Sequence, residues 1–308
     1  MKVFTSIPDY PFENKSIVTI GTFDGVHLGH RVILKRMKEI AKKTKGKSVL
    51  LTFFPHPRYV LHKDNQDMKL ITTLQEKQDL INQAGLDNLV IHEFTKKFSR
   101  IKPVNFVRDI LVEQLNVHTL VIGYDHHFGR NREGSIQELT TLADLYDFNI
   151  EKIDPQYFED VTVSSSKIRK LIEKGEMVKA KQYLGYEFML NGKVIKGNSL
   201  GKTINFPTAN IVVENKWKIL PADGVYAVKI VLEAKEYKGM MNIGQKPTVD
   251  GNGKSLEVNI FDFNQDIYGK GIEIRFVKRI RDERKFEDLQ GLKKQLLIDR
   301  NEARQILG

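Results

Sequence analysis

The sequence contains no cysteine. Disulfides, thiolate metal sites and catalytic thiols are therefore excluded, and the composition is typical of a protein of a reducing cytoplasm. No apolar run approaches the ~18 residues that a membrane-spanning helix needs, so a membrane protein is not expected. The opening segment lacks the basic-then-apolar pattern of a secretory signal, so we expect no export.

The 308 residues are 41% hydrophobic and 9% aromatic, which is enough to bury a sizeable core. The formal net charge of +10 is spread evenly, with 28 basic and 23 acidic residues in 1–184 and 21 and 16 in 185–308. The densest basic cluster, 31–47, is interpreted as a solvated helix face rather than a DNA-binding stripe. We therefore expect small phosphorylated substrates as partners, with no nucleic acid and no membrane. The oligomeric state is left open.

The first half alternates short apolar runs with helical patterns, and its length fits one of about two domains. Strands are predicted at 16–20, 48–54, 88–94, 119–123 and 148–153. Helices are predicted at 30–43, 74–84, 103–115 and 136–146. This alternation predicts an α/β, Rossmann-like fold with a parallel sheet, in which ligands bind beyond the carboxyl ends of the strands.

The second half has closely spaced strand patterns separated by turn signals. Strands are predicted at 188–196, 224–232, 237–243, 255–261 and 271–279. A helix is predicted at 286–307, with its leucines on one stripe. The pattern favours an antiparallel β-barrel or sandwich with a C-terminal helix. A short helical stretch, 167–183, precedes the boundary, which divides the chain into domains 1–184 and 185–308.

The strongest local signal is the segment 21–30, GTFDGVHLGH, which follows the first predicted strand and opens the first helix. Glycine lets the backbone approach a phosphate, and a helix N-terminus presents unpaired N–H groups. His27 and His30 are suited to donate hydrogen bonds to triphosphate oxygens where charge builds up. A tight turn with a capping histidine would explain Gly25 and Gly29 but not both imidazoles. The motif therefore indicates a nucleotidyl transferase, and no third ligand stands nearby for a metal.

Other polar residues follow the predicted strands of the first half. The run Ser164-Ser165-Ser166 precedes a helical stretch that carries Arg169, and together with the histidines it indicates a second phosphate clamp. By itself such a run is more often an ordinary helix cap. Strand ends also carry His56, Asp125 and Phe128, which are expected to form pocket walls. Asp125 and Phe128 are suited to face a second substrate, the latter by stacking.

The second half carries a glycine-rich loop followed by Phe206-Pro207-Thr208-Ala209-Asn210. Thr208 and Asn210 share one side of an extended chain, and a hydroxyl with an amide suits Mg²⁺ and phosphate oxygens. The alternative is a turn followed by an edge strand. Glu257 stands within an apolar strand, on the face opposite Leu256. It is either a general base for a hydroxyl that attacks a phosphoryl group or a solvent-facing strand residue.

Through these motifs, the whole chain resembles the bacterial bifunctional riboflavin kinase/FAD synthetase family. The resemblance runs in the family's order through 21–30, 52–57, 123–129, 164–169, 197–210, 224–226, 242–248, 257, 266–269 and 280–286. It implies an N-terminal FMN adenylyltransferase module and a C-terminal riboflavin kinase barrel. The chain departs from the family's usual residues at Lys202, Asn205, Gln245 and Lys246, all on the kinase loops, and at Ser166.

The resemblance also implies a role for each candidate residue, with His27, His30 and Glu257 catalytic. The adenylyltransferase site would bind ATP through Gly21, Phe23, Asp24, Gly25, His27, His30, Ser165, Ser166 and Arg169, and flavin through His56, Asp125 and Phe128. The kinase site would bind ATP through Gly197, Lys202, Pro207, Thr208 and Asn210, and flavin through Arg281, Glu283 and Phe286. Thr208 and Asn210 would hold Mg²⁺. The substrates and products would be riboflavin, FMN, FAD and ATP.

Three other hypotheses compete with this interpretation. An adenylyltransferase acting on another acceptor, such as phosphopantetheine, would leave Thr208, Asn210 and Glu257 unexplained. A basic RNA-binding protein is disfavoured by the even division of charge, and its binding would have to be salt-sensitive. A flavin carrier without catalysis would leave His27 and His30 without a purpose.

Overall fold

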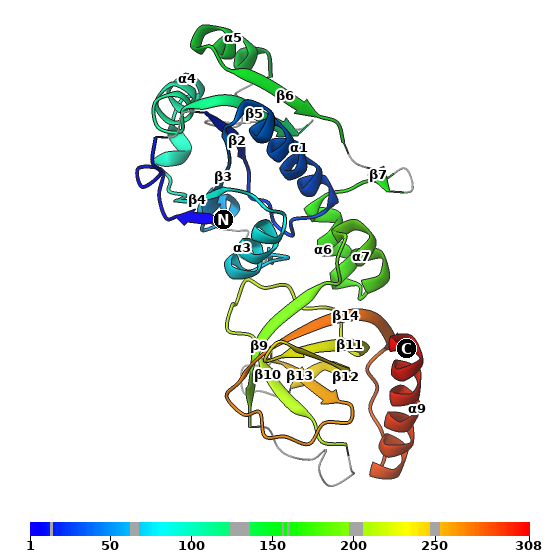
Figure 1. Ribbon diagram of the computed structural model, residues 1–308. Coiled ribbons are helices and arrows are strands. Elements are labelled where there is room, and N and C mark those ends of the chain that lie inside the picture. Colours follow the sequence, from blue (N-terminus) through cyan, green and yellow to red (C-terminus); the bar gives the residue numbers. More distant parts are fainter. Residues whose placement is uncertain are drawn as a thin grey trace. The chain divides into compact units, whose positions relative to one another are not determined.

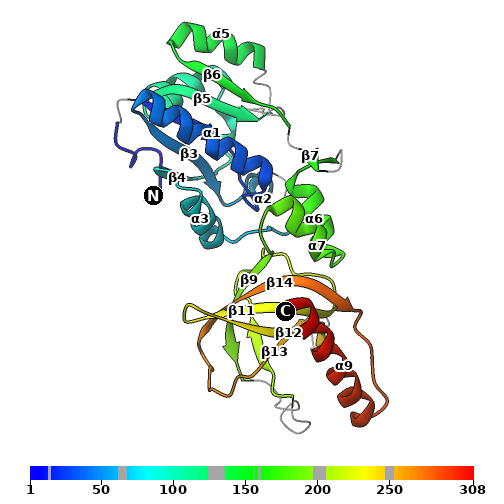
Figure 2. The same ribbon diagram turned by 45° about the vertical axis from the view of Figure 1, so that its right-hand side comes forward.

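The computed structural model describes residues 1–12, 15–61, 68–123, 136–155, 157–158, 161–196, 206–246 and 253–308. Contacts between Cα atoms divide the chain into two compact units, Met1–Ser165 and Ser166–Gly308. Figures 1 and 2 show the elements of both units. Within the described residues, none of the helices combines the length and the apolar character needed to cross a membrane.

The first unit is built on a parallel six-stranded sheet, as the α/β pattern predicts. Its strands are β1 (Lys2–Phe4), β2 (Ser16–Ile20), β3 (Lys47–Phe54), β4 (Asn88–Glu93), β5 (Val117–Gly123) and β6 (Asn149–Ile153). They lie in the order β1-β4-β3-β2-β5-β6. The chain runs outward from β2 to β3 and β4 and then returns to place β5 on the other side of β2. Because ligands of such sheets bind where the strand order reverses, the ligand site is expected at the carboxyl ends of β2 and β5.

Helices flank the strands on both faces of this sheet (Figure 1). They are α1 (Leu28–Thr44), α2 (Pro57–Leu61), α3 (Leu74–Gln83), η1 (Phe98–Arg100), α4 (Pro103–Asn105), the π-helical η2 (Phe106–Val112) and α5 (Ile136–Tyr146). One core joins β2, β3 and β5 to η2 and α5, with Phe106, Leu111 and Leu139 buried in it. The helix α1 packs on β2, β3 and β5 through its own buried side chains, Leu34, Met37 and Ala41.

The second unit holds a closed antiparallel barrel, which confirms the second predicted fold. Its strands are β9 (Met189–Ile195), β10 (Ala209–Val212), β11 (Gly224–Leu232), β12 (Lys235–Lys246), β13 (Gly253–Ile260) and β14 (Gly271–Arg281). The order around the barrel is β10-β13-β12-β11-β14-β9, and β9 pairs with β10 to close it. The C-terminal helix α9 (Leu289–Leu307) covers Phe206, Val225, Met240 and Phe261 on the outside of the barrel.

Two helices, α6 (Ser165–Glu173) and α7 (Met177–Leu184), precede the barrel, and a two-stranded ribbon, β7 (Tyr157–Phe158) and β8 (Val161–Thr162), precedes them. The prediction of one helical stretch over 167–183 is wrong, because the chain breaks at Gly175, where φ is +75°. A Cβ there would lie 2.7 Å from Arg279 Cδ and 2.8 Å from the Tyr226 hydroxyl. The break thus lets the backbone approach the barrel closely.

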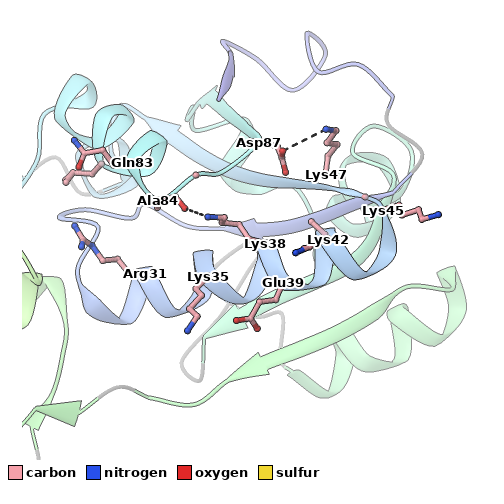
Figure 3. Close-up of a pocket in the computed structure, with 14 residues that line it drawn as sticks. Arg31, Lys35, Lys38, Glu39, Lys42, Lys45, Lys47, Gln83, Ala84 and Asp87 are labelled. Atoms are coloured by element: carbon pink, nitrogen blue, oxygen red, sulfur yellow. Dashed lines mark hydrogen bonds and ion pairs between the residues drawn. The ribbon is translucent and has the colours of Figure 1, made fainter.

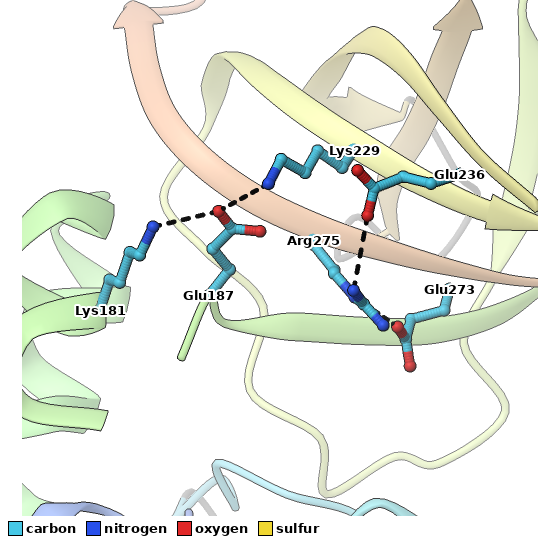
Figure 4. Close-up of polar contacts among 6 residues, drawn as sticks. All are labelled: Lys181, Glu187, Lys229, Glu236, Glu273 and Arg275. Atoms are coloured by element: carbon cyan, nitrogen blue, oxygen red, sulfur yellow. Dashed lines mark hydrogen bonds and ion pairs between the residues drawn. The ribbon is translucent and has the colours of Figure 1, made fainter. Parts of the chain in front are cut away.

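An ion-pair network ties α7 to the barrel (Figure 4). The carboxylate of Glu187 lies 3.1 Å from Lys181 Nζ of α7 and 3.2 Å from Lys229 Nζ of β11. Burial opposes ionisation of Glu187, but hydrogen bonds from these two lysines outweigh it and lower the pKa of its carboxyl. Figure 4 also shows Arg275 of β14, which is paired with Glu273 at 2.7 Å and with Glu236 at 3.5 Å. The helix α7 therefore packs against the barrel.

Candidate functional site

The histidine loop connects β2 to α1 at the carboxyl edge of the parallel sheet. Its backbone has positive φ at Phe23 (47°), Gly25 (84°) and Val26 (36°), so the loop is tightly wound. Glycine suits position 25, because φ lies in the left-handed region and a Cβ would lie 3.0 Å from Ile71 Cδ1. The Gly25 N–H donates to Thr72 Oγ1 at 3.1 Å. The segment that precedes α3 therefore fixes the loop from one side.

Asp24 fastens this loop to the same segment. Its buried carboxylate accepts hydrogen bonds from the N–H groups of Ile71 (3.0 Å) and Thr72 (3.1 Å) and from the Thr72 hydroxyl (3.3 Å). A carboxylate with this many donors keeps its orientation. The described contacts of Asp24 position the loop, and its predicted contact with ATP stays a prediction.

The two histidines of the motif lie face to face. Their ring centroids are 3.7 Å apart at 17°, and Phe23 stacks on the far side of His30 at 4.4 Å. His27 is the N-cap residue of α1, yet its side chain does not cap the helix. The backbone N–H groups of the first turn of α1 are therefore available at the place where the imidazoles meet. The loop brings together Gly21, Phe23, Gly25 and both histidines, as the sequence predicts.

His30 is held in its neutral form. Burial lowers the pKa of its imidazole well below the usual value, and the nearby charges of His27 and Lys77 lower it further. In the described part of the chain, its buried Nδ1 has no hydrogen-bond partner. An imidazole in this state can donate one N–H to an anion without carrying a charge of its own. A ligand with phosphate oxygens would supply the missing partner.

Lys77 is a charged residue of this site that the sequence analysis missed. It lies on α3, its side chain is 7% exposed, and burial lowers the pKa of its ammonium to about 8, while the charge of Asp24 acts in the opposite direction. Its influence on the His30 imidazole places it within electrostatic reach of the histidines. The signal was present in the sequence, because Lys77 falls on the apolar stripe that Leu80 and Ile81 continue.

The predicted second phosphate clamp begins at the N-terminus of α6. Ser165, the last residue of the first unit, donates from its Oγ to the carbonyl oxygen of Asp24 at 2.9 Å, so this serine is fixed to the histidine loop. Ser166 and Arg169 follow on the same helix, at its second and fifth residues. Their part in the clamp stays a prediction.

The end of β3 carries the next candidate, His56. Its Nδ1 accepts a hydrogen bond from the Arg58 N–H at 3.2 Å, and its ring lies 6.0 Å from that of Tyr59. Because β3 is parallel to its neighbour β2, His56 lies at the same edge of the sheet as the histidine loop. Asp125 and Phe128, predicted to face the flavin, lie outside the described residues.

In the second unit, the barrel brings three predicted residues together. Thr208 Oγ1 donates to Glu257 Oε2 at 3.3 Å. Asn210 of β10 is the direct partner of Glu257 of β13 in the antiparallel register, so both project from one face of the sheet. The backbone at Pro207 is fixed to β13, since its carbonyl oxygen accepts a hydrogen bond from Asn259 Nδ2 at 2.7 Å. Gly197 and Lys202 lie outside the described residues.

Glu257 is half-buried and faces away from the barrel interior, where its neighbours Leu256 and Val258 are packed. Its other register partner is Asn242 of β12, a residue that the sequence analysis did not select for the site. Asn210, Glu257 and Asn242 therefore form a row of polar side chains across three strands. The pairing of β10 with β13, which is distant in sequence, and the pairing of the consecutive strands β12 and β13 together create this row.

The residues predicted to bind flavin in this unit have described partners of their own. Arg281 forms a bidentate ion pair with the buried Asp299 of α9, at 2.7 Å from Nη2 and 3.0 Å from Nε. The Glu283 carboxylate lies against the Cα of Gly244, where any Cβ would clash with it. The Phe286 ring has the guanidinium of Arg281 at 5.7 Å. Arg281 thus anchors α9 to β14, whatever else it contacts.

Oxygen donors dominate the barrel site. The described residues hold no group of three or more His, Asp or Glu side chains arranged for a metal ion. A hydroxyl and an amide beside one carboxylate nevertheless suit Mg²⁺, which keeps several waters and is usually held by one or two protein groups together with substrate phosphates. The donor set at Thr208, Asn210 and Glu257 fits a metal that arrives with ATP.

Two family models match successive parts of the chain. A family model described as FAD synthetase matches residues 10–167, and one described as riboflavin kinase matches residues 184–307. Curated relatives match nearly the whole chain. A Bacillus subtilis bifunctional riboflavin kinase/FMN adenylyltransferase is 38% identical over 94% of this chain and 92% of its own. An Escherichia coli protein of the same description is 35% identical over 95% and 93%.

A solved structure also covers nearly the whole chain. It is a Streptococcus pneumoniae protein described as a macrolide-efflux protein, with 31% sequence identity and a TM-score of 0.91 over 98% of both chains. At this identity and coverage the two chains share both folds. The activities named by the curated relatives and by both family models are those of flavin phosphorylation and adenylylation.

Proposed function

The chain belongs to the family of bifunctional riboflavin kinase/FMN adenylyltransferases, and from this premise we propose which residues carry each activity. The enzyme phosphorylates riboflavin to FMN with ATP and then adenylylates FMN to FAD with release of pyrophosphate. We assign adenylyl transfer to residues 1–184 and phosphorylation to residues 185–308. The helix α7 closes the first of these segments although it packs with the barrel.

The observation that carries the kinase assignment is the contact between Thr208 and Glu257 at 3.3 Å, with Asn210 beside them in register. A ribityl hydroxyl is a poor nucleophile at neutral pH. The Glu257 carboxylate accepts its proton as the hydroxyl oxygen attacks the γ-phosphorus of ATP, and ADP leaves with the electrons of the broken P–O bond. Thr208 keeps the carboxylate oriented through its hydrogen bond. Because the riboflavin hydroxyl attacks ATP directly, no covalent enzyme intermediate is required.

Mg²⁺ belongs to this proposal through the donor atoms of the barrel site. Thr208 and Asn210 are the residues that would hold it, each through an oxygen atom. The ion would supply positive charge against the phosphates of ATP during transfer. Gly197, Lys202 and Pro207 complete the proposed ATP site of the kinase, and Arg281, Glu283 and Phe286 the proposed flavin side.

In adenylyl transfer, an FMN phosphate oxygen attacks the α-phosphorus of ATP and pyrophosphate leaves. Negative charge builds up on the leaving group, so donors that are fixed in advance lower the barrier. His27 and His30 supply N–H donors, and the first turn of α1 adds backbone N–H groups and the positive end of its dipole. The remaining ATP contacts assigned to this site are Gly21, Phe23, Gly25, Ser165, Ser166 and Arg169, with Asp24 positioning the loop.

The flavin of this second reaction is assigned to the edge beyond β3 and β5. His56 stands at the end of β3, and Asp125 and Phe128 follow β5 in sequence. An aromatic side chain suits stacking on the isoalloxazine ring, and a carboxylate suits its polar edge. Both substrates would then meet where the strand order of the sheet reverses. Because ATP and free flavins are the substrates, we place the enzyme in the cytoplasm.

Lys77 gives this proposal a pH dependence. Its ammonium is charged below a pKa of about 8 and neutral above it, whereas an ordinary lysine stays charged to higher pH. Its charge interacts with the Asp24 carboxylate and with the His30 imidazole. FAD formation from FMN should fall as the pH rises through about 8, because one positive charge near the triphosphate is lost.

Two variants test the role of Lys77, with initial rates measured from pH 7 to about 9.5. Lys77→Met should slow FMN adenylylation roughly 10²-fold and remove the alkaline decline. Lys77→Arg should retain activity and also lose the decline, because a guanidinium stays charged. The kinase reaction of the same preparation is the internal control. If the Lys77→Met enzyme keeps the wild-type rate and pH profile, Lys77 has no electrostatic role in adenylylation.

The overall proposal is tested by a time course with riboflavin and ATP, with the flavins separated by chromatography. FMN should appear first and FAD after a lag. Removal of divalent cations with a chelator should stop both steps, and readdition of Mg²⁺ should restore both. Riboflavin phosphorylation that continues without a divalent cation would contradict the assignment of Thr208 and Asn210 to Mg²⁺.

A further inference from the structure

A groove runs beside α1 on the first unit, and most of the charges along it are positive (Figure 3). Its volume is about 1060 Å³. Six of the lining side chains are cationic and two are acidic, a net charge of +4. We call this feature the basic groove. The charged residues that line it are Arg31, Lys35, Lys38, Glu39, Lys42, Lys45, Lys47 and Asp87.

The cations of the basic groove form a row rather than a cluster. Five of them stand on α1 or at its C-cap, at steps of three or four residues, which places them on one side of the helix. From Arg31 to Lys45 the helix rises about 21 Å at 1.5 Å per residue. Lys47, at the start of β3, extends the row beyond the end of the helix. The groove therefore presents a positive charge at nearly every helical turn along its length.

The acids of the groove offset only part of this row. Glu39 is paired with Arg36, which is not a lining residue, at 3.3 Å. Asp87 accepts from the Ser48 hydroxyl at 2.6 Å and from the Ser48 N–H at 3.0 Å. Its distance to Lys47 Nζ is 3.9 Å.

Three of the exposed cations carry charges that no described acid pairs. In the described part of the chain, the ammonium groups of Lys35, Lys42 and Lys45 make no ion pair, and all three side chains are exposed. Lys38 differs, since its Nζ donates to the Ala84 carbonyl oxygen at 2.9 Å and closes one wall of the groove. The C-terminal end of a helix attracts cations, which would explain the presence of Lys42 in the last turn of α1 and of Lys45 at its C-cap. It would not explain the cations at Arg31, Lys35 or Lys47.

Much of the basic groove lies away from the adenylyltransferase site. Lys45 and Lys47 flank the turn that leads into the amino end of β3, and Asp87 directly precedes β4. The histidine loop follows the carboxyl end of β2, and these strands are parallel. The row therefore leads from Arg31, in the first turn of α1, to the opposite edge of the sheet. None of the charges from Lys35 onward has a part in the proposed reactions.

We propose that the basic groove binds a linear chain of phosphates, with inorganic polyphosphate as its occupant. Repeated positive charges along about 21 Å match an extended polyanion better than a compact nucleotide, whose phosphates reach only one or two turns of α1. Among the residues that the structure describes, no aromatic side chain lines the groove, so they offer no platform on which the bases of a single-stranded nucleic acid would stack. Lysine ammonium groups bind phosphate as point charges and need no defined geometry.

The test compares the full-length enzyme with two triple variants of equal charge. Lys35→Gln, Lys42→Gln and Lys47→Gln together remove three cations of the groove. Lys43→Gln, Lys96→Gln and Lys97→Gln remove three exposed lysines that do not line it, the first from the same helix. Binding of fluorescently labelled inorganic polyphosphate is titrated at several salt concentrations, and both flavin reactions are measured to confirm that each variant is folded.

Wild-type and control enzymes should bind polyphosphate with an affinity that falls as salt rises. The groove variant should bind at least tenfold more weakly, and its slope of log affinity against log salt should be shallower by about 2, at roughly 0.7 for each phosphate no longer neutralised by a lysine. Equal weakening in both variants would show only a general charge effect and would overturn the proposal. Unlabelled single-stranded RNA that displaces polyphosphate at equal phosphate concentration would also overturn it, by making a nucleic acid the occupant.

Discussion

Glu257→Gln should lose riboflavin phosphorylation by about 10²–10⁴-fold while FMN supplied from outside is still converted to FAD. The substitution keeps the shape of the side chain and its place beside Thr208 and Asn210 but removes the group that accepts the proton. ATP and riboflavin should still bind, because the loss falls on the transition state and not on ground-state contacts. Initial rates of both half-reactions, measured on one preparation, give the result.

A matched control is available on a neighbouring strand. Glu236→Gln on β12 removes another barrel glutamate, which pairs at the surface with Arg275 at 3.5 Å. Exposed pairs of this kind contribute about 0–1 kcal/mol, so both reactions should remain near wild type. If Glu257→Gln behaves like this control, Glu257 is a solvent-facing strand residue and the barrel must use another base.

The second large effect is expected at the stacked histidines. His27→Ala or His30→Ala should reduce FAD formation by about 10²–10³-fold while FMN accumulates, because each change removes a fixed donor to the phosphates. The loss should be greater in kcat than in the KM for ATP, since charge builds up on the phosphates during transfer. Quantifying FMN and FAD over time from riboflavin and ATP measures both consequences together.

Folding and catalysis must be separated in this experiment, because the His30 ring is packed between His27 and Phe23. His30→Gln keeps an N–H donor in a side chain of similar reach, so it should recover part of the activity lost in His30→Ala. His118→Ala, at the amino end of β5, removes a histidine at the edge of the sheet away from the loop and should leave FAD formation unchanged. Normal FAD output from a His27→Ala/His30→Ala enzyme would contradict the ATP site proposed here.

Local patterns in the sequence were sufficient for most of the fold. The prediction for β2 agrees with the observed Ser16–Ile20, because five consecutive buried residues leave one interpretation for a short apolar run. The helix Ile136–Tyr146 also agrees with its prediction, since a clear apolar stripe marks its length. The last helix was predicted three residues too early, because Asp288 accepts from the Gly291 N–H and caps it there.

What the sequence could not supply arises from contacts between distant residues. The strand β10 has only four residues and no apolar alternation, so its pairing with β9 and β13 reveals it. The place of Lys77 on the apolar stripe of α3 is readable, but its position beside Asp24 depends on how α3 packs against the histidine loop. The ion pair of Arg281 with Asp299 likewise joins a strand to a helix. In each case the residue types are readable, while the partner is chosen by tertiary structure.

The central claim is that two separate sites on one chain act in succession, and a mixing experiment tests it most directly. Glu257→Gln and His27→Ala/His30→Ala enzymes are incubated with riboflavin, ATP and Mg²⁺, each alone and then together, and FAD is quantified by chromatography. Neither variant alone should form FAD beyond a trace, and the mixture should form it, because FMN released by one enzyme is adenylylated by the other. FAD from a single variant, or none from a mixture of two folded enzymes, would contradict the account.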